Sequence, residues 1–283
     1  MSSENLLILS LSFVVGLFVG SFLNVVSLRY GSGLSISRGR SKCFSCGHSL
    51  GVFDLVPFFS FFFLQGRCRY CGSKISLRYP LVEFVTGIIF SLVAYKMVFF
   101  GFSLTTIFKT ILAMVAFSSL VVIALYDLRH KVIPEIPLRF FWVSSLVFSG
   151  ISFYKSTHTL VNFLDLSAIL VVPLPLFLLW LMSKGRWIGF GDSKLTIGIG
   201  AMLGLAEGLS ALVLAFWIGA AFSVFALMYK KILHHSFLRG RLSNITMKTE
   251  VPFAPFLAMG TILAFAFNLD IFSINIFLSF LSV

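Results

Sequence analysis

Gly189-Phe190-Gly191-Asp192-Ser193-Lys194 opens an apolar run that continues to Leu205. The stretch places one carboxylate between two glycines and a lysine, at the mouth of a hydrophobic segment. A carboxylate at a membrane boundary is costly to desolvate, so it usually has a partner or a function. The chain offers such a partner in Asp127, which ends another apolar run in Tyr126-Asp127-Leu128-Arg129-His130.

The composition of the chain is that of a protein solvated mainly by lipid. Of 283 residues, 58% are hydrophobic, 11% are charged and 35 are phenylalanine. This balance excludes an ordinary soluble core. A net charge of +12 is compatible with nucleic-acid binding, but here the charges are spread over short loops between apolar runs. We therefore interpret them as a topology signal and expect no nucleic-acid partner.

The apolar runs predict an all-α integral membrane protein with about eight transmembrane helices. Each run approaches the roughly 20 residues that a spanning helix needs. Gly16, Gly20 and Ser21 form a small-residue face suited to close helix packing, and Pro173 and Pro175 should kink or interrupt the fifth span. The candidate spans are 6–28, 81–102, 107–126, 137–153, 160–182, 188–205, 209–229 and 252–269.

Three domains follow from this division. Residues 1–28 form the first transmembrane helix, 29–80 form a polar cytoplasmic insert, and 81–283 form a seven-helix membrane bundle.

Positive charge separates the two sides of this predicted bundle. The gaps 29–80, 127–139, 183–194 and 230–251 hold 8, 3, 3 and 5 Lys or Arg residues, which is 19 of the 22 in the chain. Because basic residues accumulate in cytoplasmic loops, these gaps are expected in the cytoplasm and both termini outside.

The same topology places Asp127 and Asp192 at similar depth on the cytoplasmic rim. Two adjacent carboxylates in a partly dry site share a proton, so one can activate a water molecule while the other polarises a carbonyl. Gly189 and Gly191 would allow a substrate strand to approach closely. The alternative is that each aspartate only flanks or caps a helix, but two on one rim favour a catalytic pair.

Three charged neighbours of the pair have simpler explanations. Lys194 fits an ordinary positive-inside residue. His130 and Glu135 follow Asp127 closely enough to tune it, yet as interfacial loop residues they are expected to face water.

The insert carries two matched cysteine pairs, Cys43-Phe44-Ser45-Cys46-Gly47 and Cys68-Arg69-Tyr70-Cys71-Gly72. This spacing suits one tetrahedral four-thiolate zinc site with Cys43, Cys46, Cys68 and Cys71 as ligands. Disulfides or a redox pair are the alternatives, but the cytoplasm keeps thiols reduced. Closed coordination implies a structural metal that stabilises a module with little core of its own.

Taken together, these motifs resemble the type IV prepilin peptidases, the leader peptidases of type IV pilus and type II secretion systems. The resemblance covers nearly the whole chain, whereas Gly-x-Gly-Asp alone is shared with presenilin-like proteases. It rests on the two cysteine pairs, Asp127 and the segments 20–26, 66–71, 75–83, 189–195 and 252–256.

The resemblance implies an aspartic endopeptidase with Asp127 and Asp192 as its catalytic pair. Such enzymes sit in the bacterial cytoplasmic membrane and remove a short basic leader from prepilins and pseudopilins at the cytoplasmic face. Members with the cysteine segment typically also N-methylate the new terminal residue, with S-adenosylmethionine as methyl donor. Glu83, Gly87, Gly189, Gly191 and Lys194 fall in stretches that the resemblance associates with substrate or methyl transfer.

Two departures from the family pattern concern the insert and the loop after Asp127. Leu55-Val56-Pro57 stands where Asn-Ile-Pro is usual, and Glu135 stands for a common Asp. No glycine-rich nucleotide loop is visible, so no methyl-donor residues are predicted.

Three other functions compete with this interpretation. The first is peptidase activity alone, with the zinc module as a docking surface. The second is a non-enzymatic assembly factor that binds pilin-like helices, which would need no paired carboxylates. The third is a transporter, whose acids should follow a path through the membrane instead of meeting at one rim.

Overall fold

The protein is described here by a computed structural model, which covers residues 3–98, 101, 103–155, 159–233 and 251–274. Within these ranges the chain is helical, and its only extended pairing is two isolated bridges in the insert. The helices are α1 Ser3–Arg29, η1 Phe53–Leu55, α2 Phe59–Phe63, α3 Arg78–Val98, α4 Leu104–His130, α5 Glu135–Lys155, α6 Thr159–Val171, α7 Leu174–Ser183, α8 Phe190–Leu233 and α9 Ala254–Phe267.

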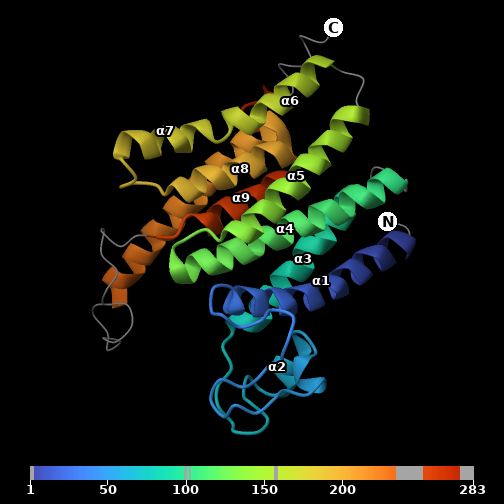
Figure 1. Cartoon of the computed structure of the whole chain (residues 1–283), viewed down its shortest axis with the longest axis vertical. Helices are drawn as coiled ribbons and strands as arrows, with labels where there is room; N and C mark the ends of the chain where they lie inside the picture. The colour runs from blue at the N-terminus through green and yellow to red at the C-terminus, as the bar shows by residue number, and fades with distance from the viewer. Residues whose placement is uncertain (1–2, 99–100, 102, 156–158, 234–250, 275–283) are drawn as a thin grey trace.

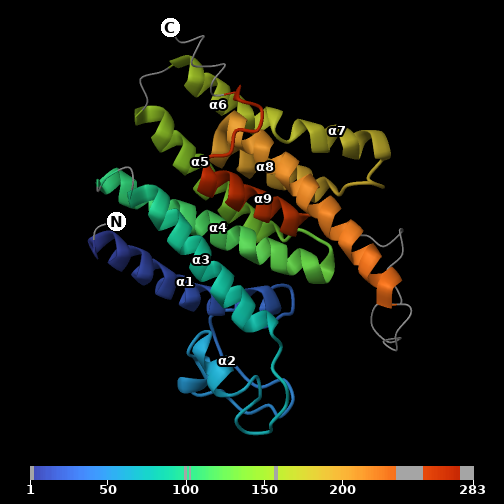
Figure 2. The ribbon, with the colours of Figure 1, turned by 180° about the vertical axis from the view of Figure 1, so that it is seen from behind.

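The long helices lie roughly side by side as a bundle, and the segment with α2 projects from one flank (Figures 1 and 2). Six of the described helical segments are long and apolar enough to cross a membrane. The predicted all-α membrane fold is therefore confirmed. The count of eight spans stays a prediction, because α9 and the part of α8 before Gly204 have only 14 residues each.

A glycine turns α8 back on itself. Gly204 has φ 76° and ψ −170°, a backbone conformation outside the helical region. A Cβ on Gly208 would lie 3.6 Å from the Gly200 Cα, so the arms 190–203 and 205–233 pack against each other. The predicted boundary between the sixth and seventh spans lies at this turn.

Prolines in this chain lie at the ends of helices and not at kinks within them. The predicted interruption of the fifth span is confirmed, since α6 ends at Val171 and α7 begins at Leu174. In α3 the helix begins at Arg78, three residues before the predicted start at Leu81. Pro80 is tolerated there because the N–H groups of a first turn have no intrahelical acceptor.

The predicted small-residue face of α1 packs against α3. A Cβ on Gly16 would come within 2.7 Å of the Gly87 Cα, and one on Gly20 within 2.7 Å of the Glu83 Cα. Backbone approach this close needs glycine. The contact fixes α1 and the insert that follows it against the bundle.

A hydrophobic core joins the remaining helices and holds their ends in register. Its fully buried members come from α3 through α9 and include Phe117, Leu120, Ile123, Phe141, Leu195, Ile199 and Leu257. Because this core is shared, the C-terminal end of α4 and the N-terminal ends of α8 and α9 meet at one end of the bundle.

Candidate active site and metal centre

Asp127 lies in the last turn of α4 and is only 5% exposed. Its Oδ2 accepts a hydrogen bond of 3.2 Å from the backbone N–H of Ala254, the first residue of α9. The first N–H groups of a helix have no acceptor within the helix and favour a negative partner. The carboxylate is thus oriented by a helix that lies 127 residues further along the chain.

Asp192 lies in the first turn of α8, and Asp127 is near enough for the two charges to interact. The Gly189 backbone also bonds to the Asp192 carboxylate. A Cβ on Gly191 would approach the Ile133 side chain to 3.2 Å, so this glycine packs α8 onto the loop that follows α4. The structure therefore brings together the two aspartates that the sequence singled out.

This arrangement could supply an acid and a base. Two neighbouring carboxylates can hold one proton between them, which leaves one oxygen free to accept a proton from water. The protonated partner can donate to a carbonyl oxygen. Paired carboxylates at one rim are suited to peptide hydrolysis and are not needed for simple binding.

Two charged neighbours of the pair face solvent as expected, but His130 ends α4 and Glu135 begins α5, so neither is the loop residue that was predicted. His130 and Glu135 are exposed, and Glu135 pairs with Arg139 at 3.0 Å. The Lys194 ammonium lies 5.1 Å from the centre of the Phe190 ring. The backbone carbonyl of Lys194 accepts a hydrogen bond of 2.9 Å from the Trp142 indole N–H. These contacts hold the start of α8 and give Lys194 no direct role in the pair.

The four cysteines converge on one point. Their Sγ atoms all lie within 4.8 Å of one another, and those of Cys43 and Cys71 are 3.9 Å apart. Tetrahedral zinc with Zn–S bonds of about 2.3 Å needs sulfurs about 3.8 Å apart. The donor set and its spacing fit a tetrahedral thiolate-bound metal.

Two equivalent turns build this cluster. Gly47 and Gly72 adopt positive φ angles of 71° and 68°. Their N–H groups donate hydrogen bonds of 2.9 Å to the carbonyls of Cys43 and Cys68 respectively. The backbone amides of Cys46 and Ser45 lower the pKa of Cys43 to about 6. Thiolate is the metal-binding form, so the turn itself prepares a ligand.

Asp54 organises the same module, a role that the sequence analysis did not assign to it. Its carboxylate accepts from the Gly51 N–H at 3.0 Å and pairs with Arg69 at 2.8 Å, while the Tyr70 hydroxyl lies 3.4 Å away. It therefore links the segment after the first cysteine pair to the second pair. Its position in a predicted polar loop gave no signal of this.

Glu83 and Gly87 occupy the interface of α1 and α3. Glu83 is 8% exposed, and its Oε2 accepts a hydrogen bond of 2.7 Å from the Phe58 N–H in the cysteine module. The Ser21 hydroxyl also bonds to this carboxylate. A Cβ on Gly87 would lie 2.9 Å from the Phe13 ring, so Gly87 serves helix packing.

The module and the aspartate pair lie at the same end of the bundle. Tyr30, which directly follows α1, packs edge-on against Tyr126, the neighbour of Asp127, with ring centres 5.3 Å apart. The Tyr30 hydroxyl also accepts from the Ile136 N–H at 3.4 Å. The end of α1 therefore adjoins the helix end that carries Asp127.

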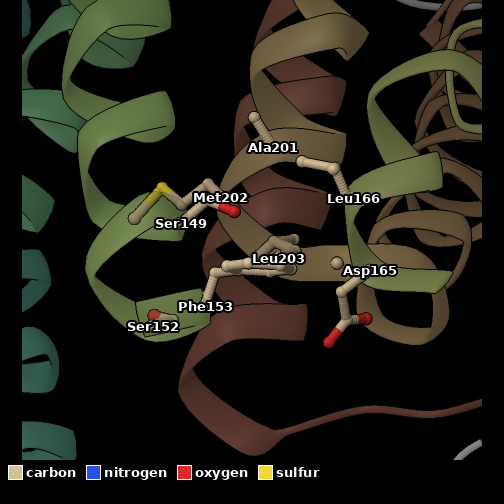
Figure 3. Close-up of a pocket in the computed structure, with 9 residues that line it drawn as sticks. Ser149, Ser152, Phe153, Asp165, Leu166, Ala201, Met202 and Leu203 are labelled. Atoms are coloured by element: carbon tan, nitrogen blue, oxygen red, sulfur yellow. The ribbon is translucent and has the colours of Figure 1, made fainter. Parts of the chain in front are cut away.

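A separate cavity of about 140 Å³ lies beside the α8 turn (Figure 3). Gly204 is twelve residues beyond Asp192, or about 18 Å along a helix. The Asp165 Oδ1 accepts from the Leu205 N–H at 3.2 Å and so caps the second arm of α8. This carboxylate has a structural function away from the aspartate pair. The cavity lining is completed by Ser149, Ser152, Phe153, Leu166, Ala201, Met202 and Leu203.

Two family models match the chain. One, the bacterial peptidase A24 N-terminal domain, matches residues 14–97, and the other, the type IV leader peptidase family, matches residues 114–224. The first covers the cysteine module and the second both aspartates. No solved structure matches the chain.

Curated relatives give the same result. A prepilin leader peptidase/N-methyltransferase of Bacillus subtilis is 32% identical over 95% of this chain and 98% of its own length. Proteins of the same name from Myxococcus xanthus and Burkholderia pseudomallei are 34% and 29% identical. The Myxococcus xanthus match covers 76% of this chain and 62% of that relative. The Burkholderia pseudomallei match covers 89% of this chain and 83% of that relative. The resemblance drawn from the sequence motifs is confirmed.

Proposed function

The chain belongs to the type IV leader peptidase family, and from this membership we propose that it is a membrane aspartic endopeptidase acting on prepilins and pseudopilins. It removes their leader peptide and then N-methylates the new terminal residue. The observation that carries the proposal is the meeting of Asp127 with Asp192 at one end of the bundle.

In this proposal the two aspartates hydrolyse one peptide bond. The ionised carboxylate takes a proton from a water molecule, and the water oxygen attacks the scissile carbonyl carbon. The protonated carboxyl donates its proton to the carbonyl oxygen. When the C–N bond breaks, the leaving amine receives the proton that was taken from water, and the re-forming carbonyl returns its proton to the second carboxylate. The Ala254 N–H keeps Asp127 aimed at the reacting atoms through this sequence.

The cysteine module, taken as residues 29–77 and not 29–80 because α3 already begins at Arg78, is proposed to hold structural zinc through Cys43, Cys46, Cys68 and Cys71. Four thiolates leave the metal no open position for substrate, so the metal braces the module and takes no part in peptide hydrolysis. The module stands beside the aspartate pair through the Tyr30–Tyr126 contact, and a processed substrate would remain within its reach.

S-adenosylmethionine is proposed as the methyl donor, which supplies an electrophilic methyl group to the new amino terminus. The support for this second activity is the name of the relatives, which includes N-methyltransferase. Glu83 is the buried carboxylate that joins the module to α3, and we propose that it positions the module for this step.

The enzyme is proposed to lie in the bacterial cytoplasmic membrane with both termini outside. The support is the charge distribution, because 19 of the 22 Lys and Arg residues fall in the gaps on one side. The aspartate pair and the module would then face the cytoplasm. The three-part division into first helix, cysteine module and seven-helix bundle belongs to the same proposal.

The test is an assay of the purified protein on a prepilin, with and without S-adenosylmethionine, followed by mass spectrometry. We expect leader removal in both reactions and a further mass gain of one methyl group only with the donor. Cleavage without methylation would reduce the function to that of a peptidase. Loss of cleavage within minutes of adding a chelator, with the fold intact, would indicate a metalloprotease instead.

A further inference from the structure

The cysteine module exposes large aromatic side chains on one face. Phe53, Phe59, Phe62 and Phe63, here called the phenylalanine patch, are 80%, 53%, 60% and 85% exposed. Three of them belong to the short helix α2. An apolar surface of this kind on a water-facing module marks a site that something else covers.

The phenylalanine patch continues the lipid-facing surface of the bundle. Phe58, which precedes α2, stacks on Phe84 of α3 with ring centres 5.2 Å apart and an interplanar angle of 24°. On the neighbouring helices, Phe22 of α1 and Leu81 of α3 are 53% and 62% exposed. In both views α2 lies alongside the flank of α1 and not beyond its C-terminal end (Figures 1 and 2).

A partly buried hydrogen bond fixes α2 in that position. The Glu83 carboxylate, inside the α1–α3 interface, accepts the Phe58 N–H at 2.7 Å. Phe58 has φ 63°, a conformation that a phenylalanine adopts only when its surroundings impose it. The patch is thus held beside the membrane helices and cannot swing freely into water.

The charge of the module suits the bilayer surface. Residues 29–77 contain seven Lys or Arg residues and a single acid, Asp54. A groove of about 280 Å³ runs between Phe53, Phe59 and Phe63, with Arg69 on its lining. Aromatic and basic side chains together favour an interface with anionic lipid.

From these observations we infer that the phenylalanine patch inserts into the bilayer leaflet on the side of the aspartate pair, where anionic phospholipid covers it. The cysteine module is then a membrane-bound element, with its basic residues among the headgroups. This inference concerns the lipid contact of the module and stands whether or not the proposed enzymatic activities hold.

Two tryptophan variants of equally exposed phenylalanines test the inference. Phe63 of the patch is 85% exposed, and Phe44, beside a cysteine turn, is 84% exposed. Phe63→Trp and Phe44→Trp are reconstituted in phosphatidylcholine–phosphatidylglycerol vesicles, with and without brominated acyl chains. The fluorescence of the unsubstituted protein, which has four Trp residues, is subtracted.

We expect brominated chains to quench the tryptophan at position 63 severalfold more than the one at position 44, and aqueous iodide to do the reverse. Phe59→Trp should behave as Phe63→Trp, which guards against a local effect of one substitution. Equal iodide quenching at positions 63 and 44, without bromine quenching, would overturn the inference. Shielding of position 63 only after prepilin is added would also overturn it, because the patch would then bind substrate.

Discussion

At the scale of single residues, the decisive feature is how Asp127 and Asp192 are held. Each carboxylate sits at a helix end, and each receives a backbone N–H, from Ala254 and Gly189 respectively. These backbone donors lie at or next to the start of a helix, so they can hold the two carboxylates without help from other side chains. In the proposed mechanism, such fixed donors would hold the two carboxylates in place before any substrate arrives.

Asp127→Asn and Asp192→Asn should each reduce leader cleavage by at least about 10²–10⁴-fold, because an amide can neither accept nor donate the transferred proton. The double variant should lose no more than either single one, since the two residues act as a unit. Initial rates on a prepilin, with thermal unfolding as a check of the fold, measure this.

The matched control is Asp165→Asn. Its side-chain oxygen can still accept the Leu205 N–H, and it lies at the opposite end of an α8 arm. It should cleave at nearly the unsubstituted rate. Substantial cleavage by either variant of the pair would refute the aspartic mechanism.

Glu83 raises a second question at this scale, namely whether its carboxylate positions the module or takes part in chemistry. Glu83→Ala leaves the partly buried Phe58 N–H without its acceptor, at a local cost of up to about 1–3 kcal/mol. Glu83→Gln keeps an acceptor of the same length. If Glu83 positions the module, methylation should fall in the alanine variant and largely survive in the glutamine variant.

Hydrogen exchange separates the two roles of Glu83. The Phe58 amide should exchange faster in Glu83→Ala and stay protected in Glu83→Gln. Loss of methylation in both variants with protection intact in the glutamine variant would instead assign the carboxylate to chemistry.

At the scale of helices and modules, glycine determines which elements can meet. Gly20→Ala should destabilise the fold by about 1–3 kcal/mol, because its Cβ would come within 2.7 Å of the Glu83 Cα and push α1 from α3. Gly150→Ala in α5 has open space around the new Cβ and should be neutral or stabilise by about 0.5–1 kcal/mol. Thermal unfolding in one detergent compares the two variants, and equal stability would contradict the assigned packing.

The cysteine module makes a second prediction at this scale. Each of Cys43→Ser, Cys46→Ser, Cys68→Ser and Cys71→Ser should release zinc and loosen residues 29–77, with similar and non-additive effects. Methylation should fail first, and cleavage should fall less, because the aspartates belong to other helices.

Zinc content, methyl transfer and cleavage are measured on the same cysteine-variant preparations. Full zinc content in any single variant would argue against a four-cysteine site. Methylation that survives while cleavage disappears would mean that the module serves the other activity.

These elements also show what sequence can and cannot predict. Apolar length, proline and small residues predicted the membrane helices, the break near Pro173 and the small-residue face of α1, because each is a local property of the chain. The Ala254 N–H on Asp127 and the Phe58 N–H on Glu83 join residues 127 and 25 positions apart. Backbone donors carry no sequence signal, so contacts of this kind appear only in the fold.

At the scale of the whole molecule, the open question is orientation. The structure places the cysteine module and the aspartate pair at one end, through the contact of Tyr30 with Tyr126. In the predicted eight-span topology, 19 of the 22 Lys and Arg residues lie in gaps on one side. The two observations agree, because the module and the start of α8 both fall in basic gaps.

Reporter fusions test this orientation. Fusions after Leu50 and Leu242 should be cytoplasmic, and fusions after Gly101 and Val283 should lie outside, because basic loops are retained in the cytoplasm. Leu242 and Val283 lie outside the described residues, whereas Leu50 is in the module and Gly101 lies between α3 and α4. A paired alkaline phosphatase and green fluorescent protein fusion at each site gives opposite signals on the two sides. A cytoplasmic Val283 fusion with the other three as expected would mean that α9, the 14-residue helix between Leu242 and Val283, does not cross. A cytoplasmic Val283 fusion together with an outside Leu242 fusion would instead mean that the 190–203 arm of α8 does not cross, because at 14 residues it is about 21 Å long against a hydrocarbon core of about 30 Å.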